Sequence, residues 1–221
     1  MAETDKARLV VLASGNGSNF QAIIDACEAG RLDAEVVRLI VNRPGAYALE
    51  RAAQHGIPAE VIDHKDYADR ERFDAALAEA VAAAEPDWIV MAGFMRILTD
   101  GFVDRFQGRL INIHPSLLPK YPGMNTHARA LDNGDTVHGA TVHFVTPTVD
   151  AGPPIIQGQI EIHADDTPER LKERIHRIEH RIYPQAIEWL IEGRVDFDHA
   201  GRQPAPAVVD IDGQVIAPAQ G

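Results

Sequence analysis

The sequence has little cysteine, no long hydrophobic run and a shortage of positive charge. Cys27 is its one cysteine, so no intramolecular disulfide can form, and a reducing compartment is favoured. The apolar runs have only the length of strands, which predicts no membrane span. The first residues lack the basic and apolar segments of a secretory signal. We therefore expect a cytoplasmic protein, with Cys27 as a small buried residue on the apolar face of a helix.

The charge balance is strongly acidic. The 221 residues carry 33 Asp and Glu against 21 Lys and Arg, a formal net charge of −12. Binding to a phosphate backbone depends on Lys and Arg, so we expect no nucleic-acid partner, although a local basic pocket for one small anion stays possible. With 45% hydrophobic and 24% charged residues, the composition is typical of a globular domain.

Short β-branched runs alternate with segments of helical spacing in the first half of the chain. The expected strands cover residues 7–14, 35–42, 57–62, 87–94 and 109–114, and the expected helices cover 19–28, 46–55 and 69–84. This alternation predicts βαβ units. The predicted fold class is α/β, a doubly wound, Rossmann-like and mostly parallel sheet with helices on both faces.

The pattern changes in the second half. Residues 138–145 and 153–163 form longer alternating segments, which predict antiparallel strands and a mixed sheet toward the C-terminal half. A long helix is expected from Thr167, a good N-cap, to Ile191. Asp212-Gly213 between two apolar runs is a hairpin signal. We expect one domain over residues 1–193 and a C-terminal extension over residues 194–221.

A glycine-rich loop, SGNGSN at residues 14–19, joins the first expected strand to the first expected helix. Gly15 and Gly17 allow a tight turn, and the N-terminus of the helix offers N–H groups to a phosphate. The third glycine of a dinucleotide fingerprint is replaced by Phe20, and the Gly-Lys-Ser/Thr of a Walker loop is missing. The loop therefore suits a phosphate, although ordinary turn chemistry explains such a loop about as often.

A second candidate site follows the strand at residues 109–114. Asn112 and His114 are two residues apart and share one face of this strand, at the end where open α/β sheets bind ligands. The next segment contains three prolines and should be stiff. Asp150, in a Pro- and Gly-rich turn, is the candidate carboxylate partner. The alternatives are a strand end with a satisfied histidine and a turn aspartate, and spacing alone does not decide between them.

Five segments in this order make the sequence recognisable: SGNGSN, AGFMRIL, NIHPSLLPKYPG, HGATVHFV and VDAGPPIIQ. Together they resemble the phosphoribosylglycinamide formyltransferase family, folate-dependent enzymes of purine synthesis, over residues 8–193. The resemblance implies transfer of the formyl group of 10-formyltetrahydrofolate, the co-substrate, to the amine of 5'-phosphoribosylglycinamide. It also implies two half-sites, one for the phosphorylated substrate and one for folate, and no metal.

The resemblance assigns roles to matching positions. The implied catalytic residues are Asn112, His114 and Asp150. The residues implied to bind phosphoribosylglycinamide are Gly17, Ser18, Asn19 and Glu179. The residues implied to line the folate pocket are Arg70, Met95, Arg96, Ile97, Leu98, Asn112, Thr146, Val149 and Asp150. Two positions depart from the family pattern, because Asn125 replaces a common His and His176 replaces an expected Gln.

The implied chemistry is acyl transfer. Asn112 and His114 would donate hydrogen bonds to the oxyanion that forms when the amine attacks the formyl carbon. Asp150 would favour a protonated His114 and accept the proton of the amine. The ten histidines contain no H-E-x-x-H spacing for a metal.

Three alternatives stay open. Methionyl-tRNA formyltransferase shares the Asn-x-His element but should add a tRNA-binding domain and a basic surface. Formyltetrahydrofolate deformylase should carry a regulatory domain before the first strand, which this sequence lacks. A non-catalytic protein that binds phosphorylated metabolites would keep the glycine-rich loop without needing Asn112, His114 and Asp150 together. For all of them we expect small-molecule ligands, no membrane partner, and a monomer or homodimer.

Overall fold

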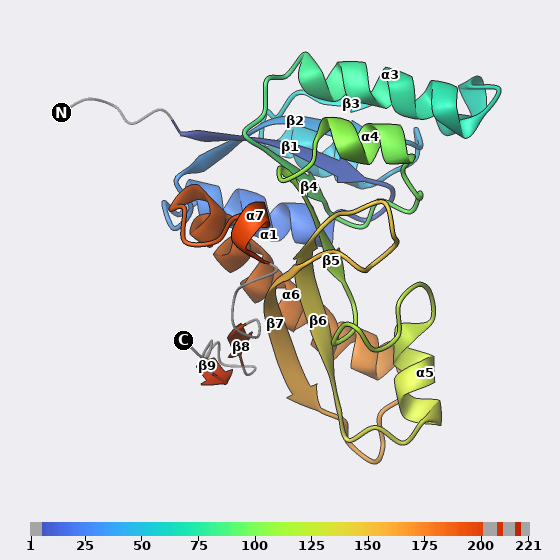
Figure 1. Ribbon diagram of the computed structural model, residues 1–221, viewed down its shortest axis with the longest axis vertical. Coiled ribbons are helices and arrows are strands. Elements are labelled where there is room, and N and C mark those ends of the chain that lie inside the picture. Colours follow the sequence, from blue (N-terminus) through green and yellow to red (C-terminus); the bar gives the residue numbers. More distant parts are fainter. Residues whose placement is uncertain (1–5, 201–206, 210–214, 218–221) are drawn as a thin grey trace. The chain divides into compact units, whose positions relative to one another are not determined.

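A computed structural model describes residues 6–200, 207–209 and 215–217 (Figure 1). The chain divides into two compact units, residues 1–111 and residues 112–221. Strand β5 (Leu110–His114) begins in the first unit and ends in the second. Each unit is built around its own β-strands.

The first unit contains four parallel strands in the order β3-β2-β1-β4. Their bounds are Ala7–Ala13 for β1, Ala34–Val41 for β2, Ala59–Val61 for β3 and Trp88–Met91 for β4. Strand β1 is central, and residues 9–13 in it are fully buried. A β-branched run buried on both faces explains why its sequence is apolar throughout instead of alternating.

Helices cover both faces of these strands. Their bounds are Ser18–Glu28 for α1, Ala48–Gln54 for α2, Arg70–Ala82 for α3 and Asp100–Arg105 for α4, with a 3-10 turn η1 at His64–Asp66. Figure 1 shows α1 on one side of the strands and α3 with α4 on the other. Helix α2 contacts α1, and α3 contacts α4. The parallel, doubly wound arrangement predicted from the sequence is confirmed.

Side-chain caps fix where the helices of this unit start. The carboxylate of Asp69 accepts a hydrogen bond from the Arg72 N–H (2.8 Å), which starts α3. The Thr99 hydroxyl accepts one from the Phe102 N–H (3.4 Å), which starts α4. Gly30 follows α1 with φ +67°, a conformation that glycine adopts without strain. These residues satisfy the backbone groups that a helix end leaves unpaired.

The second unit has a mixed sheet. Strand β6 (Val137–Phe144) pairs antiparallel with β7 (Pro154–Glu161), which pairs parallel with β8 (Ala207–Val209). Strand β9 (Val215–Ala217) pairs antiparallel with β8. The predicted antiparallel pair and the predicted C-terminal hairpin are therefore confirmed, while Asp212-Gly213 of the turn lies outside the described residues.

Three helices accompany these strands: α5 (Thr126–Asp132), α6 (Pro168–Ile191) and α7 (Phe197–Ala200). Helix α6 begins as predicted, with the Thr167 hydroxyl accepting from the Arg170 N–H at 3.3 Å. It packs on both β6 and β7. A Cβ atom on Gly158 of β7 would overlap Ile178 of α6, so the missing side chain permits this close packing.

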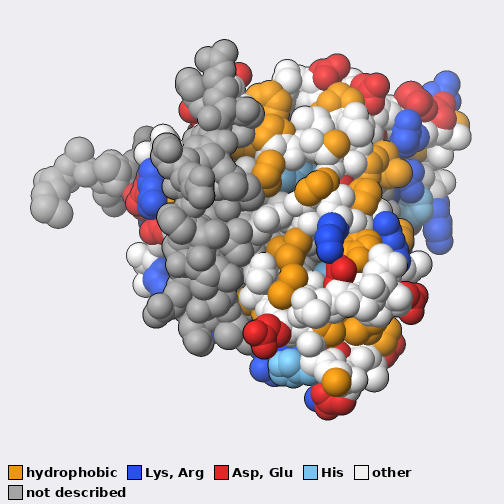
Figure 2. Space-filling view, turned by 60° about the horizontal axis from the view of Figure 1, so that its bottom comes forward, with side chains coloured by type: hydrophobic (Ala, Val, Ile, Leu, Met, Phe, Trp, Pro, Cys, Tyr) orange, Lys and Arg blue, Asp and Glu red, His pale blue; other side chains and the backbone are white. Residues whose placement is uncertain are grey.

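The surface is mixed in character. On the face drawn in Figure 2, hydrophobic side chains are exposed in separate groups among polar atoms, with charged side chains of both signs around them. Among the helices described, none combines the length and the apolar composition that a bilayer span requires. The long helix α6 has a buried face, and charged residues occupy its other positions.

Candidate active site

The end of β5 brings His114 against two hydrogen-bond acceptors. Its Nε2 atom lies 2.8 Å from the carbonyl oxygen of Tyr121, and its Nδ1 atom lies 3.4 Å from Oδ2 of Asp150. A carbonyl can only accept, so Nε2 carries a hydrogen. A doubly protonated ring can also donate from Nδ1 to the carboxylate. The His114 side chain is buried, with 7% of its surface exposed, so this pair is shielded from solvent.

Asp150 occupies a constrained position in the loop between β6 and β7. Its φ is +53°, in the left-handed region that few residues other than glycine adopt, although aspartate is among those that do. Its Oδ2 accepts a hydrogen bond from the Gly123 N–H at 2.8 Å. The carboxylate therefore contacts both His114 and the loop after β5, although the sequence spacing alone had left its partner open.

His143 is a fourth member of this cluster, which the sequence interpretation missed. Its Nδ1 donates to the carbonyl of Phe144 (2.8 Å), so its Nε2 is free to accept from the Asn112 amide (3.4 Å). The same Nε2 lies 3.8 Å from Oδ1 of Asp150. Burial holds the pKa of His143 below its usual range, which keeps the ring neutral and able to accept. A histidine between Val142 and Phe144 in a buried strand was the available signal.

The proline-containing loop after β5 is held firmly from β6 and β7. The Thr141 hydroxyl donates to the Ser116 carbonyl (2.7 Å) and accepts from the Leu118 N–H (3.1 Å). The Gln157 amide donates to the Leu118 carbonyl at 2.8 Å. Ser116 and Thr141 are fully buried. These bonds support the prediction of a stiff loop, and they fix the Tyr121 carbonyl that His114 contacts.

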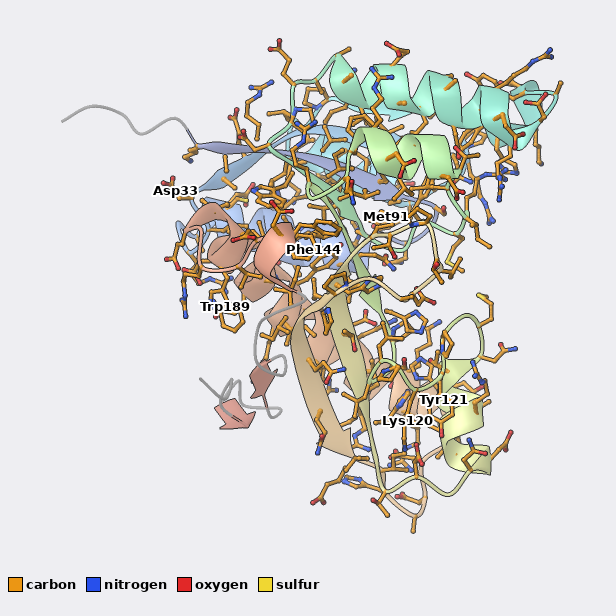
Figure 3. All side chains as sticks on the ribbon, viewed as in Figure 1. Asp33, Met91, Lys120, Tyr121, Phe144 and Trp189 are labelled. Atoms are coloured by element: carbon orange, nitrogen blue, oxygen red, sulfur yellow. The ribbon has the colours of Figure 1, made fainter. Side chains whose placement is uncertain are left out.

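The far end of this loop is tied to Asp135. Figure 3 shows Lys120 and Tyr121 beside α5. The Tyr121 hydroxyl donates to the Asp135 carboxylate (2.8 Å), and the Lys120 ammonium lies 3.1 Å from it. The Tyr121 hydrogen bond, followed by that of Lys120, lowers the pKa of Asp135. The carboxylate thus anchors the two residues that precede the end of the loop.

The glycine-rich loop lies in the first unit, at the start of α1. Gly17 is the residue before the helix and has φ +74°. A Cβ atom there would lie 2.8 Å from the Cβ atom of Ala48 in α2. Arg51 holds the loop by donating to the Asn16 carbonyl (2.9 Å) and to its side-chain oxygen (3.0 Å). The glycine is therefore required by contact with α2, whereas Gly15 faces open space.

The segment after β4 exposes apolar side chains. Met95 and Ile97 are 54% and 58% exposed, whereas Leu98 is buried at 6%. The Arg96 guanidinium stacks on the Phe73 ring, 4.9 Å from its centre. Of the residues expected to line a folate pocket in this unit, Met95 and Ile97 are thus the most available to a ligand, and Leu98 serves as a core residue.

The remaining folate candidates differ in exposure. Arg70 is exposed at the first position of α3. In the second unit, Val149 is 46% exposed and Thr146 is half-buried, with its hydroxyl donating to the Thr148 carbonyl at 3.2 Å. Arg70 and Val149 are therefore free to meet a ligand without rearrangement.

The family scan agrees with the motifs that these loops carry. The model of the formyl transferase family matches residues 7–187. The chain belongs to the formyl transferase family. It is 47% identical over 187 residues to phosphoribosylglycinamide formyltransferase of Escherichia coli, which covers 85% of this chain and 88% of that protein. A formyl transferase fold is therefore the frame for every loop described above.

Longer and solved relatives extend this likeness. The trifunctional purine biosynthetic protein adenosine-3 of Drosophila melanogaster is 48% identical over 195 residues, which are 87% of this chain and 14% of that protein. The structure of phosphoribosylglycinamide formyltransferase from Coxiella burnetii, in complex with CHES, superimposes with a TM-score of 0.84 at 49% identity. It covers 87% of this chain and 90% of that one.

This formyl transferase carries Glu179 and both departures from the family pattern in its second unit. Glu179 is buried at 4% on α6, and its charge adds to burial in raising the pKa of Tyr183. Asn125 is exposed before α5 with φ +58°, a conformation that asparagine tolerates. The His176 ring stacks on His180, 6.2 Å between centres, and burial lowers the pKa of His176.

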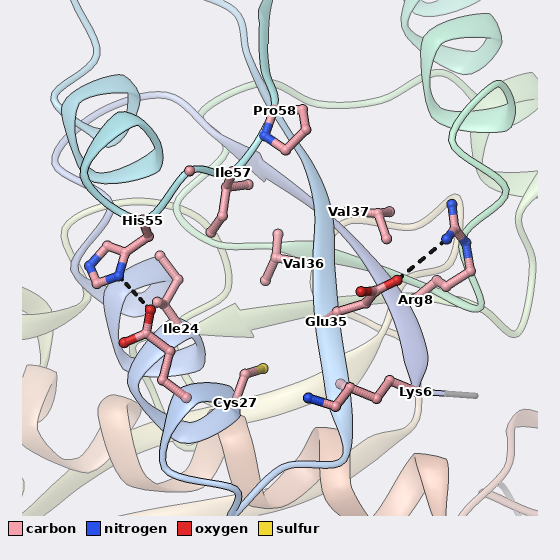
Figure 4. Close-up of a pocket in the computed structure, with 13 residues that line it drawn as sticks. Lys6, Arg8, Ile24, Cys27, Glu35, Val36, Val37, His55, Ile57 and Pro58 are labelled. Carbon is pink, nitrogen blue, oxygen red and sulfur yellow. Dashed lines mark hydrogen bonds and ion pairs between the residues drawn. The ribbon is translucent and has the colours of Figure 1, made fainter. Parts of the chain in front are cut away.

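A hollow of about 470 Å³ lies away from all of these residues (Figure 4). It is lined at the start of β1 and by the ends of α1 and α2, and His55 and Glu28 form an ion pair of 2.7 Å beside it. Cys27 lines it and is half-buried, not a full core residue as predicted, and burial raises the pKa of its thiol to about 11. In the described part of the chain, no three His, Cys, Asp or Glu side chains gather as metal ligands do.

Proposed function

We propose that the chain transfers the formyl group of 10-formyltetrahydrofolate to the amine of 5'-phosphoribosylglycinamide, in de novo purine synthesis. The observation that carries this proposal is the cluster of Asn112, His114, His143 and Asp150, held by the contacts described above in a chain of the formyl transferase family. The names of the E. coli and Coxiella relatives support the choice of substrate. In this proposal tetrahydrofolate is the second product.

The cluster supplies donors for the developing oxyanion. As the amine attacks the formyl carbon, negative charge forms on the formyl oxygen. Asn112 has two amide hydrogens, and the bond to His143 uses one of them, which leaves the other for the oxyanion. His114 is the second donor, and Asp150 stabilises its charged form. Each such donor is typically worth about 3 kcal/mol of the barrier.

Asp150 is also the proton acceptor. The attacking amine must lose a proton, and the bond from the formyl carbon to the folate nitrogen breaks once that nitrogen can leave. A carboxylate beside a histidine can take the proton directly or through water. The side chain is only 9% exposed, so its charge is weakly screened by solvent. The Gly123 N–H fixes the carboxylate in this orientation.

Separate segments suit the two substrates. At the glycine-rich loop, Gly17, Ser18 and Asn19 place the positive end of α1 where a phosphate binds well. Glu179 is the candidate partner of the glycinamide amine. The exposed apolar side chains of Met95, Ile97 and Val149 suit a flat pterin, and the exposed cation of Arg70 suits a glutamate carboxylate.

The test is formyl transfer by the purified protein and its Asp150→Asn variant. Asparagine keeps the size of the side chain and tolerates the same φ, but it removes the charge and the proton acceptor. We expect turnover with both substrates saturating to fall by at least ~10². The matched control is Asp132→Asn, which neutralises an exposed carboxylate at the end of α5 and should leave turnover unchanged.

Two assays on the same samples separate the alternatives. Formylated phosphoribosylglycinamide supports the proposal, whereas formate released without the amine substrate would indicate a deformylase. Binding of phosphoribosylglycinamide without any turnover would indicate a non-catalytic binding protein. A folded Asp150→Asn variant with near-normal turnover would remove Asp150 from the mechanism.

A further inference from the structure

A buried serine joins the two loops that we assign to the two substrates. Ser14 directly follows β1, the central strand, and is the first residue of the glycine-rich loop. Its hydroxyl accepts a hydrogen bond from the Met95 N–H (2.8 Å) and donates one to Oδ1 of Asn42 (2.6 Å). Its own N–H donates to the Gly93 carbonyl (3.1 Å). Ser14 therefore ties the ends of β2, β1 and β4 together.

The hydroxyl has no freedom to change partners. Ser14 is 3% exposed and Asn42 is 1% exposed, so water has little access to either group. The Asn42 side-chain oxygen can only accept, which commits the hydroxyl hydrogen to it and leaves a lone pair for Met95. A shift of Ser14 must carry the Met95 N–H with it or leave that N–H unpaired, which is unfavourable.

These contacts link the phosphate loop to the folate segment within one unit of the chain. Gly17, Ser18 and Asn19 follow Ser14 by a few residues, and the exposed side chains of Met95 and Ile97 begin at the amide that Ser14 holds. We propose that Ser14 is a positioning residue that couples the two substrate sites. Order imposed on the glycine-rich loop by the phosphorylated substrate passes through the hydroxyl to Met95 and tightens folate binding.

This inference rests on the proposed function, and it makes a quantitative statement about binding. Coupling between two ligands is reciprocal, so each must tighten the other by the same factor. Phosphoribosylglycinamide and tetrahydrofolate can be bound together without reaction, because tetrahydrofolate carries no formyl group. Calorimetry then gives the Kd of tetrahydrofolate with and without saturating phosphoribosylglycinamide. We expect the wild-type ratio to be at least about 5, within the usual range for coupled sites.

Ser14→Ala should reduce that ratio to below about 2 while both ligands still bind. A residue with only a structural role would weaken binding without changing the ratio. The matched control is Asp74→Asn, at the other end of the same segment. Asp74 is 1% exposed and accepts from the Thr99 N–H at 2.5 Å, an interaction that the asparagine oxygen can keep. This control should retain the wild-type ratio.

Each outcome decides the question. A wild-type ratio near 1, an unchanged ratio in Ser14→Ala, or equal loss in Asp74→Asn overturns the coupling proposal. If the wild-type protein binds neither ligand and transfers no formyl group, the proposed function itself fails. Should Ser14→Ala not fold, Ser14→Cys places a weaker hydrogen-bonding group at the same point and should lower the ratio partway. An NMR signal of the Met95 amide that shifts with phosphoribosylglycinamide alone in wild type, but not in the variant, gives a second test.

Discussion

Gly17→Ala should destabilise the fold before it affects any ligand. The sequence suggested that a side chain at Gly17 would fill the path of a phosphate. In the structure, its Cβ would instead lie 2.8 Å from Cβ and 3.1 Å from Cα of Ala48. The left-handed φ of +74° costs roughly 1–2 kcal/mol for a residue other than glycine. Overpacking against a helix adds about 1–3 kcal/mol.

Together these terms predict a loss of roughly 2–5 kcal/mol in the free energy of unfolding. For a chain of this size that is a fall in Tm of about 5–15 °C. Thermal melting and urea titration measure it directly. Gly15→Ala is the control, because a Cβ there meets no atom within 4 Å and its φ is outside the left-handed region. The Tm of this control should stay close to that of the wild type.

A second substitution separates the two causes. Ala48→Gly in the Gly17→Ala background removes the atom that the new Cβ meets. It should recover the packing part of the loss and leave the backbone part, apart from the small cost of glycine in a helix. If Gly17→Ala melts with the wild type, or if Gly15→Ala is equally destabilised, the contact with α2 does not explain the glycine.

Two further predictions concern the second unit. Burial lowers the pKa of His127 and of His138 to about 4, and their ring nitrogens lie 3.1 Å apart. Unfolded histidines take up protons near pH 6.5, so this pair contributes stability above that pH and loses it as the pH falls to about 4. His127→Gln should make the urea-unfolding profile less steep in that window, and parallel profiles would contradict the assignment. Gly158→Ala should lower Tm because its Cβ overlaps Ile178, and Ile178→Ala should relieve part of that loss in the double variant; strictly additive losses would refute the overlap.

The long periodic elements were predictable because burial writes them into the sequence. The apolar run of β1, the capped start of α3 and the long amphipathic α6 each carry several turns or residues of consistent pattern. Helices α4 and α5 were missed, since six and seven residues contain too few turns for a period to appear. The division into a domain over residues 1–193 and an extension stays a prediction.

The candidate site was only partly readable. Asn112 and His114 could be placed on one strand face from their spacing, and Asp150 could be named only as a candidate partner. His143 escaped notice because its role depends on contacts across strands, to the Asn112 amide and to the Asp150 carboxylate. Ser14 escaped for the same reason, since its bonds to Asn42 and Met95 join residues that are far apart in sequence. Local patterns report on burial, whereas a hydrogen-bond network exists only after the chain has folded.

The left-handed backbone of Asp150 sets activity against stability at a single position. Glycine would adopt φ +53° with less strain, so Asp150→Gly would relax this turn while removing the carboxylate that faces His114. Selection for a more stable turn alone would therefore favour a residue that abolishes the proposed chemistry. Stabilising libraries built from consensus turn residues should leave this position out, because there an inactive protein could score better than an active one.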